Sequence, residues 1–183
     1  MALSINNLKQ RLRPQSKEEA GFEAIFNTHW DPVMAVLFRL VGDQDEAQDL
    51  ALEVFWRLHR QPPTDRRNLG GWLYRVATNL GLNALRARKR RQRYEEQAGQ
   101  HALSSRAIPN PALIVERNEQ REQVQRVMLQ IKPRSAQLLT LRYSGFSYAE
   151  LAEVINVSPR SIGTLLARAE REFEKAYRAL EGG

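Results

Sequence analysis

Residues 71–91, GWLYRVATNLGLNALRARKRR, constrain the fold more than any other stretch because their apolar residues recur at helical spacing. On a helix of 3.6 residues per turn, one side is apolar and is predicted to face a core; it carries Leu73, Val76, Ala77, Leu80, Ala84 and Ala87. The opposite side, called the polar stripe below, carries Trp72, Arg75, Asn79, Asn83, Arg86 and Arg90. The stretch therefore predicts one long amphipathic helix.

The polar stripe combines side chains that suit unpaired nucleic acid. A base stacks on an indole, amides read its hydrogen-bonding edge, and guanidinium groups follow the phosphates. Two other interpretations are an ordinary solvated helix face and an indole that anchors the helix start after the Leu-Gly-Gly sequence at 69–71. Nucleic-acid contact is favoured because neither of these explains the whole combination.

The remaining periodicity also predicts helices, and no segment alternates with period two for long enough to form a strand. Helices are expected over 21–41, where Pro32 should kink or split the helix, and over 45–60. Further helices are expected from 113 and from Pro133 up to Gly145. The fold class is all-α: two small helical domains joined by a flexible linker. The expected parts are an arm over 1–20, a first domain over 21–93, a linker over 94–112 and a second domain over 113–183.

Charge is distributed unevenly along the chain, whose formal net charge is +7. From Ser16 to His59 there are three cations and nine acids, and from Arg60 to Arg93 there are ten cations and one acid. An acidic segment followed by a basic one indicates two partners of different kind, one of them nucleic acid.

Composition excludes several other classes of protein. The chain has no cysteine, so disulfides, thiolate nucleophiles and cysteine zinc sites are absent, and a reducing cytoplasm is expected. The longest apolar run, VMAVLF, is too short to cross a bilayer. No phosphate-binding loop, zinc-protease motif or nucleophile elbow occurs, so we expect no enzyme, no cofactor and no metal.

The segment from Ser147 to Phe173 has the pattern of a helix-turn-helix. Ser147 and Glu150 form a capping box, and a turn at Asn156 precedes Ser158, which is expected to cap a second helix that begins at Pro159. The shared core is expected to take Leu151, Ala152, Ile155, Val157, Ile162 and Leu165. The outward positions, which could enter a major groove, are Arg160, Ser161, Thr164, Arg168 and Arg171.

Together these motifs resemble the bacterial RNA polymerase sigma factors of the extracytoplasmic-function (ECF) group. GDQDEAQDLALEVFWRLHR resembles the family's second conserved region, GWLYRVATNLGLNALRARKRR its promoter-opening part, and residues 119–178 its fourth region. The resemblance covers roughly Phe22 to Tyr177. It implies a factor that binds core RNA polymerase and directs promoter recognition, DNA melting and transcription initiation.

The resemblance also implies roles for particular residues. The polymerase β′ clamp helices would be bound by Asp49, Leu50, Glu53, Val54 and Phe55, and the β flap is a further implied partner. The minus-ten strand would be bound by Asp65, Arg66, Arg67, Asn68, Trp72, Arg75, Asn79, Asn83, Arg86, Arg88, Lys89, Arg90 and Arg91. The minus-thirty-five duplex would be read by Ser158, Arg160, Ser161, Thr164, Arg168 and Arg171. Many relatives are held inactive by an anti-sigma factor, and the resemblance leaves room for such a partner here.

The sequence departs from the family pattern at three positions. Gly163 and Leu165 stand where basic residues are common, so upstream contacts are expected to be fewer, and Leu52 stands where glutamine is common. The main alternative function is a stand-alone helix-turn-helix regulator whose first half senses a ligand or dimerises. An RNA-binding or structural helical protein is a third alternative.

Overall fold

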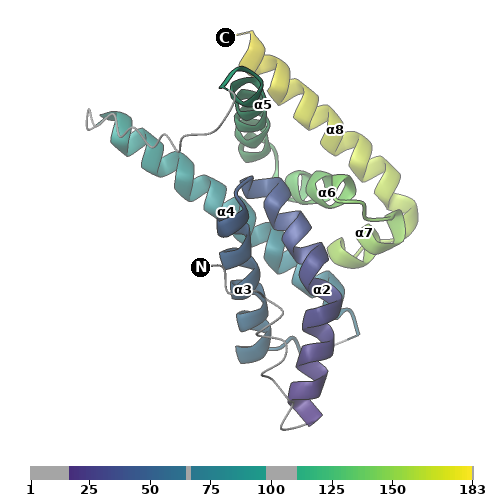
Figure 1. Cartoon of the computed structure of the whole chain (residues 1–183). Helices are drawn as coiled ribbons and strands as arrows, with labels where there is room; N and C mark the ends of the chain where they lie inside the picture. The colour runs from purple at the N-terminus through teal and green to yellow at the C-terminus, as the bar shows by residue number, and fades with distance from the viewer. Residues whose placement is uncertain (1–16, 65–66, 98–110, 183) are drawn as a thin grey trace.

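The computed structural model describes residues 17–64, 67–97 and 111–182, all of whose regular elements are helices (Figure 1). Most of the expected arm, most of the expected linker and the pair Asp65 and Arg66 lie outside these residues. The all-α fold class is confirmed.

The first half of the described chain is a bundle of α2 (Lys17–Val41), α3 (Gln44–Arg60) and α4 (Leu69–Gln97). A sharp turn at Gly42, with φ of 76°, ends α2, and the Asp43 carboxylate then caps α3 by accepting a 2.9 Å hydrogen bond from the Glu46 amide. The C-terminal part of α4 extends beyond the other two helices (Figure 1).

Pro32 lies inside α2, which runs unbroken from Lys17 to Val41, so the helix is not split at this residue; a kink there stays a prediction. Aromatic packing holds the helix on the side of Pro32 toward the N-terminus, where the Phe26 and Trp30 rings stack with centroids 4.9 Å apart. On the other side Val33 is fully buried. Tertiary packing therefore overrides the local penalty of a missing amide donor.

The core side of α4 is wider than periodicity predicts. Leu73 and Ala77 are buried as expected, but Leu82 and Leu85 are also buried. The cause is that α4 packs against α2 and α3 and also against helices of the second half. At Gly81 the α2 helix comes so close that a Cβ atom would lie 2.6 Å from Cδ1 of Leu40.

The second half consists of α5 (Pro111–Gln130), α6 (Pro133–Tyr143), α7 (Tyr148–Ile155) and α8 (Pro159–Glu181). The predicted capping box at Ser147 and Glu150 is present, and Asn156 ends α7 in the left-handed region with φ of 55°. Pro159 is the first residue of α8 as predicted, but Ser158 makes no side-chain cap bond. The helix-turn-helix geometry is thus formed by α7, the Asn156 turn and α8.

Candidate nucleic-acid and polymerase interfaces

The polar stripe on α4 is largely accessible. Arg75, Asn79 and Asn83 are exposed, and the Asn83 side-chain oxygen accepts a 2.8 Å hydrogen bond from Arg86. Trp72 is half-buried and packs against the core, so only part of its indole is available for stacking. The stripe therefore presents an aromatic edge, amides and guanidinium groups along one helix.

The residue before α4 has a structural role as well as the predicted one. The Asn68 side-chain oxygen accepts a 2.8 Å hydrogen bond from the Gly71 amide, which caps the start of α4. Arg67 is exposed, whereas Asp65 and Arg66 lie outside the described residues. The segment from Asp65 to Asn68, which the resemblance assigns to the minus-ten strand, therefore ends in a helix cap at Asn68.

The cationic side chains at the basic end of α4 are of two kinds, paired within the fold or exposed. Arg88 forms an ion pair of 2.5 Å with Glu46 of α3 and donates to the Val41 carbonyl at the end of α2. It thus ties the three helices together. Lys89 is half-buried, and Arg90 and Arg91 are exposed. The exposed pair is the better candidate for phosphate binding, which stays a prediction.

The predicted polymerase-binding residues on α3 do not all share one face. Asp49 is exposed, Leu50 is half-buried, and Glu53 accepts a 2.7 Å hydrogen bond from Arg57. Val54 and Phe55, by contrast, are 0% and 2% exposed. The Phe55 ring lies against Phe26 of α2, with centroids 4.8 Å apart. The prediction that Val54 and Phe55 contact the polymerase directly is therefore corrected: both side chains belong to the core.

Two residues that were not predicted complete the exposed face of α3. Leu52 is 49% exposed and Trp56 is 52% exposed, and they stand one helical turn apart. The Arg60 guanidinium lies 4.7 Å above the Trp56 ring. The acidic face is defined here as Asp45, Asp49, Leu52, Glu53 and Trp56. The signal that could have revealed Leu52 and Trp56 is their i, i+4 spacing on the side away from the buried Ala51, Val54 and Leu58.

The outward face of α8 is open. All five predicted groove-facing residues are exposed, namely Arg160, Ser161, Thr164, Arg168 and Arg171. Ile162, Leu166 and Ala169 on the other side are buried. Leu165, where the sequence departs from the family pattern, is half-buried and packs against the core, so it contributes to packing.

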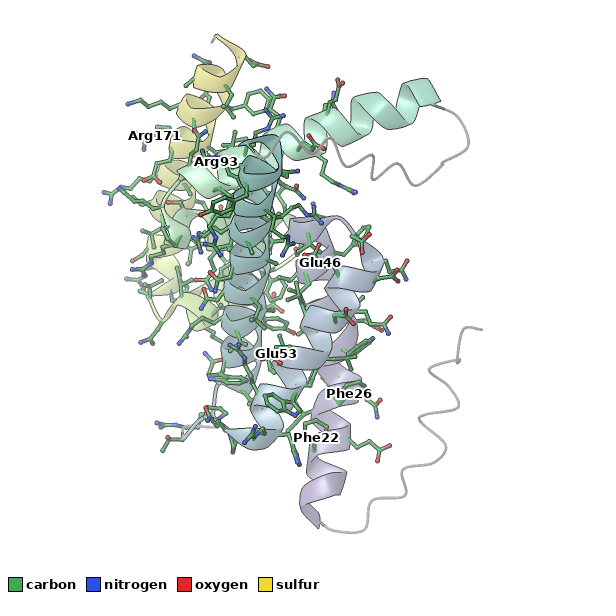
Figure 2. The ribbon with its side chains drawn as sticks, turned by 90° about the vertical axis from the view of Figure 1, so that its left-hand side faces the viewer. Phe22, Phe26, Glu46, Glu53, Arg93 and Arg171 are labelled. Atoms are coloured by element: carbon green, nitrogen blue, oxygen red, sulfur yellow. The ribbon has the colours of Figure 1, made fainter. Side chains whose placement is uncertain are left out.

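The charged residues labelled in Figure 2 lie on different sides of the molecule. Figure 2 shows Glu46 and Glu53 along α3, Arg93 on the upper part of α4, and Arg171 on α8 at the side away from α3. These two acids thus lie apart from these two arginines, while Arg57, Arg60 and Arg88 lie beside the acids of α3. Complementary partners are therefore expected to approach from different directions.

Within the described ranges, no group of three or more histidine, aspartate or glutamate side chains is placed to hold a metal ion. Across the same residues, no helix is long and apolar enough to cross a bilayer.

The fold is all-helical with a helix-turn-helix in its second half, and the family comparisons identify the class of protein. The sigma-70 region 2 family model matches residues 25–91, and the sigma-70 region 4 family model matches residues 121–173. The chain belongs to the sigma-70 family, in its ECF group of RNA polymerase sigma factors.

Individual relatives match along nearly the whole chain. The RNA polymerase sigma-H factor of Pseudomonas aeruginosa is 29% identical over 179 residues, which is 92% of each chain. The ECF RNA polymerase sigma factor SigW of Bacillus subtilis is 25% identical over 185 residues, covering 94% of this chain and 98% of that one. A solved structure of the sigma factor RpoE with the anti-sigma factor NepR from Bartonella quintana covers 86% of this chain and 97% of that one, at a TM-score of 0.48 and 18% identity.

Proposed function

We propose that initiation is divided among three surfaces of this sigma factor. The acidic face of α3 docks on core RNA polymerase, the polar stripe and basic end of α4 hold the melted minus-ten strand, and α8 reads the minus-thirty-five duplex. The observation that carries the proposal is that one chain exposes an acidic, partly apolar helix face and, on two other helices, faces rich in arginine.

The acidic face has the composition of a protein-binding surface. Leu52 and Trp56 supply apolar contact area at its centre, and Asp45, Asp49 and Glu53 supply charge around them. A basic or dipolar partner surface would be steered toward this face, since opposite charges accelerate encounter and set orientation. The β′ clamp helices of core polymerase are the proposed partner, and the β flap is the proposed partner of the second half.

The polar stripe supports strand binding through three kinds of interaction. Trp72 offers a partial stacking surface, Asn79 and Asn83 offer amides, and the exposed Arg90 and Arg91 offer charge for phosphates. Stacking on an aromatic side chain is worth roughly 1 to 3 kcal/mol per base. An unpaired strand is favoured over a duplex because a base inside a duplex has no free face to stack.

The exposed face of α8 supports duplex reading. Arg160 and Ser161 lie in the first turn of this helix, the part of a recognition helix that contacts base edges in the major groove. The protein thus supplies sequence specificity while the polymerase carries out the chemistry, so it needs no catalytic centre or cofactor of its own. It would act in the cytoplasm, where bacterial polymerase and DNA are found.

The test is a titration of the fluorescently labelled chain with purified bacterial core RNA polymerase at moderate salt, with albumin as the control. Saturable binding that albumin does not reproduce is the expected result. Binding to duplex DNA without any binding to core polymerase would contradict the proposal and favour a stand-alone regulator. A preference for RNA over both would favour an RNA-binding protein.

A further inference from the structure

An apolar cavity lies where helices of both halves meet. Its volume is about 340 Å³, and α2, α4, α5, α6 and α8 all contribute side chains to its wall. Cavities that bind small molecules in proteins measure roughly 300 to 1,000 Å³ and have mostly apolar walls. An apolar cavity of about 150 Å³ already takes one benzene ring. This cavity therefore has room for a molecule with two aromatic rings, or for an aliphatic chain of similar size.

The floor of the cavity is apolar and almost fully buried. It is formed by side chains that are between 3% and 8% exposed, namely Leu40 of α2, Leu85 of α4, Met128 of α5 and Leu139 of α6. Phe173 of α8 is half-buried and adds an aromatic ring to the wall. The unbranched Met128 side chain adapts its shape to what it contacts. The apolar body of a ligand would leave water at this floor, which favours binding.

The mouth of the cavity is accessible to solvent. Val124 of α5 is 41% exposed and Tyr143 of α6 is 62% exposed, and both residues line the cavity. Exposed apolar side chains that continue into a buried apolar wall are typical of ligand-binding grooves. A small molecule can therefore reach the floor from solvent at this side of α5 and α6.

Two polar side chains of the wall offer hydrogen-bond acceptors. The side-chain nitrogen of Gln125 donates to the Leu40 and Val41 carbonyls at 2.9 and 3.1 Å, so its oxygen is the atom that remains for a ligand. The Thr140 hydroxyl donates to the Ala136 carbonyl at 2.9 Å, so its oxygen is likewise left as an acceptor. A ligand that carries an N–H or O–H group matches these two acceptors.

The charges at the cavity are balanced. Its charged lining residues are Arg39 of α2 and Glu170 of α8, and both are exposed. Within the described part of the chain, the side chain of neither residue forms an ion pair or a hydrogen bond, so both charges act on a bound molecule. A charged ligand would be attracted by one of them and repelled by the other. An uncharged ligand also avoids the cost of taking a charge out of water.

We propose that this cavity binds a small uncharged molecule whose apolar body has one or two rings, or an aliphatic chain of that size, with one N–H or O–H donor. The body contacts Leu85, Met128 and Leu139, and the donor binds the acceptors of Gln125 and Thr140. Such a molecule is a partner of a different kind from polymerase and DNA. The site goes beyond the proposed function and does not depend on it.

The first test compares two fluorescent probes that share one apolar body. Phenylnaphthylamine is uncharged, has one N–H donor and fluoresces strongly in apolar surroundings, and anilinonaphthalene sulfonate adds a negative charge to the same skeleton. Each probe is titrated with the full chain. The uncharged probe is expected to bind saturably, at least about tenfold more tightly than the sulfonate. No saturable binding of the uncharged probe, or equal affinity for the two probes, would overturn the proposal.

The second test locates the uncharged probe. Val124→Trp puts a larger side chain at the mouth, and the variant is expected to fold because Val124 is 41% exposed. Arg126→Trp is the matched control, since Arg126 is exposed on the same helix and lies about 200° around its axis from Val124. Val124→Trp should weaken probe binding at least about tenfold, and the control should leave it unchanged. Equal affinity of the two variants would show that the probe binds elsewhere and would refute the site.

The third test examines the two charges of the rim. Arg39→Gln leaves Glu170 unbalanced, and Glu170→Gln leaves Arg39 unbalanced. The sulfonate is expected to bind about two- to fivefold more weakly to Arg39→Gln and about two- to fivefold more tightly to Glu170→Gln than to the unmodified chain. The uncharged probe should bind all three chains alike. A sulfonate affinity that is the same in all three would contradict the role given to these charges.

Binding at the cavity should also stabilise the folded chain, because the wall exists only when the helices are packed. With the uncharged probe at about ten times its dissociation constant, the midpoint of thermal unfolding, followed by circular dichroism, is expected to rise by about 3 to 5 °C. The rise should be absent in Val124→Trp and present in Arg126→Trp. An unchanged midpoint in the unmodified chain would count against the site. These measurements need neither polymerase nor DNA, so they succeed or fail independently of the proposed function.

Discussion

Removal of the two exposed apolar side chains of α3 is expected to weaken binding to core polymerase strongly. The change is Leu52→Ala combined with Trp56→Ala, which leaves the acidic side chains of the face in place. Leu52 is 49% exposed and Trp56 is 52% exposed, so about half of each residue is available for burial by a partner. Both residues are already half outside the core, so the variant is expected to fold.

The magnitude follows from the exposed fraction. Full burial of a large apolar side chain is worth about 1.5 to 3 kcal/mol, so burial of half of each is worth roughly 0.75 to 1.5 kcal/mol. The two together give about 1.5 to 3 kcal/mol, if each contributes independently. Since about 1.4 kcal/mol corresponds to a tenfold change, the dissociation constant is expected to rise about 12- to 140-fold.

The assay is fluorescence anisotropy of the labelled chain titrated with core polymerase, and thermal unfolding checks that the variant is folded. Phe38→Ala is the matched control because Phe38 is 42% exposed in the same bundle but lies on α2. The control should bind with unchanged affinity. Equal affinity of the double variant and the unmodified chain would refute the assignment of this face to polymerase docking.

Three further predictions concern charge, packing and pH. Arg90→Ala combined with Arg91→Ala should make promoter binding less sensitive to salt. The slope of log affinity against log salt concentration should fall in magnitude by about 0.7 to 0.9 for each phosphate that is no longer neutralised. An unchanged slope would show that these two arginines do not bind phosphates. Gly81→Ala should lower the free energy of unfolding, measured in urea, by about 1 kcal/mol, because crowding of the new methyl group against Leu40 exceeds the gain in helix propensity. A gain in stability would contradict the close packing of α4 against α2 at this position. Burial lowers the pKa of His29 below 6.5, so the folded state binds the proton less readily than the unfolded chain. Its contribution is complete above pH 6.5 and is lost as the pH falls through the lowered folded pKa, so the unfolding free energy should drop as the pH falls below 6.5. A smaller drop is expected in His29→Gln, and an equal drop would exclude His29 as the cause.

The parts of the fold that depend on local signals were predicted well. The capping box at Ser147, the left-handed turn at Asn156 and the helix start at Pro159 each follow from chemistry within a few residues. The exposed face of α8 follows from the same local pattern. Pro32 does not split its helix, because stacking of neighbouring aromatic rings and burial in the bundle hold α2 together on both sides of it.

The parts that depend on packing between distant residues were not predictable from one sequence. Helical spacing places Val54 and Phe55 on the apolar side of α3 and Leu52 and Trp56 away from it, but it does not show that Phe55 packs against Phe26 of α2. The position of Arg75 against the Val154 carbonyl joins residues 79 apart, and no local pattern indicates it. The burial of Leu82 and Leu85 on α4 also depends on packing between distant residues, because α4 contacts helices of both halves.

The central claim is that this chain gives core RNA polymerase its promoter specificity. The most direct measurement is in vitro transcription of fragmented genomic DNA from the source organism by purified core polymerase, with and without the protein, followed by mapping of the RNA 5′ ends. The expected result is a set of new start sites that share sequence elements near minus ten and minus thirty-five and that disappear with the Leu52→Ala and Trp56→Ala variant. Start sites that are the same with and without the protein would contradict the claim.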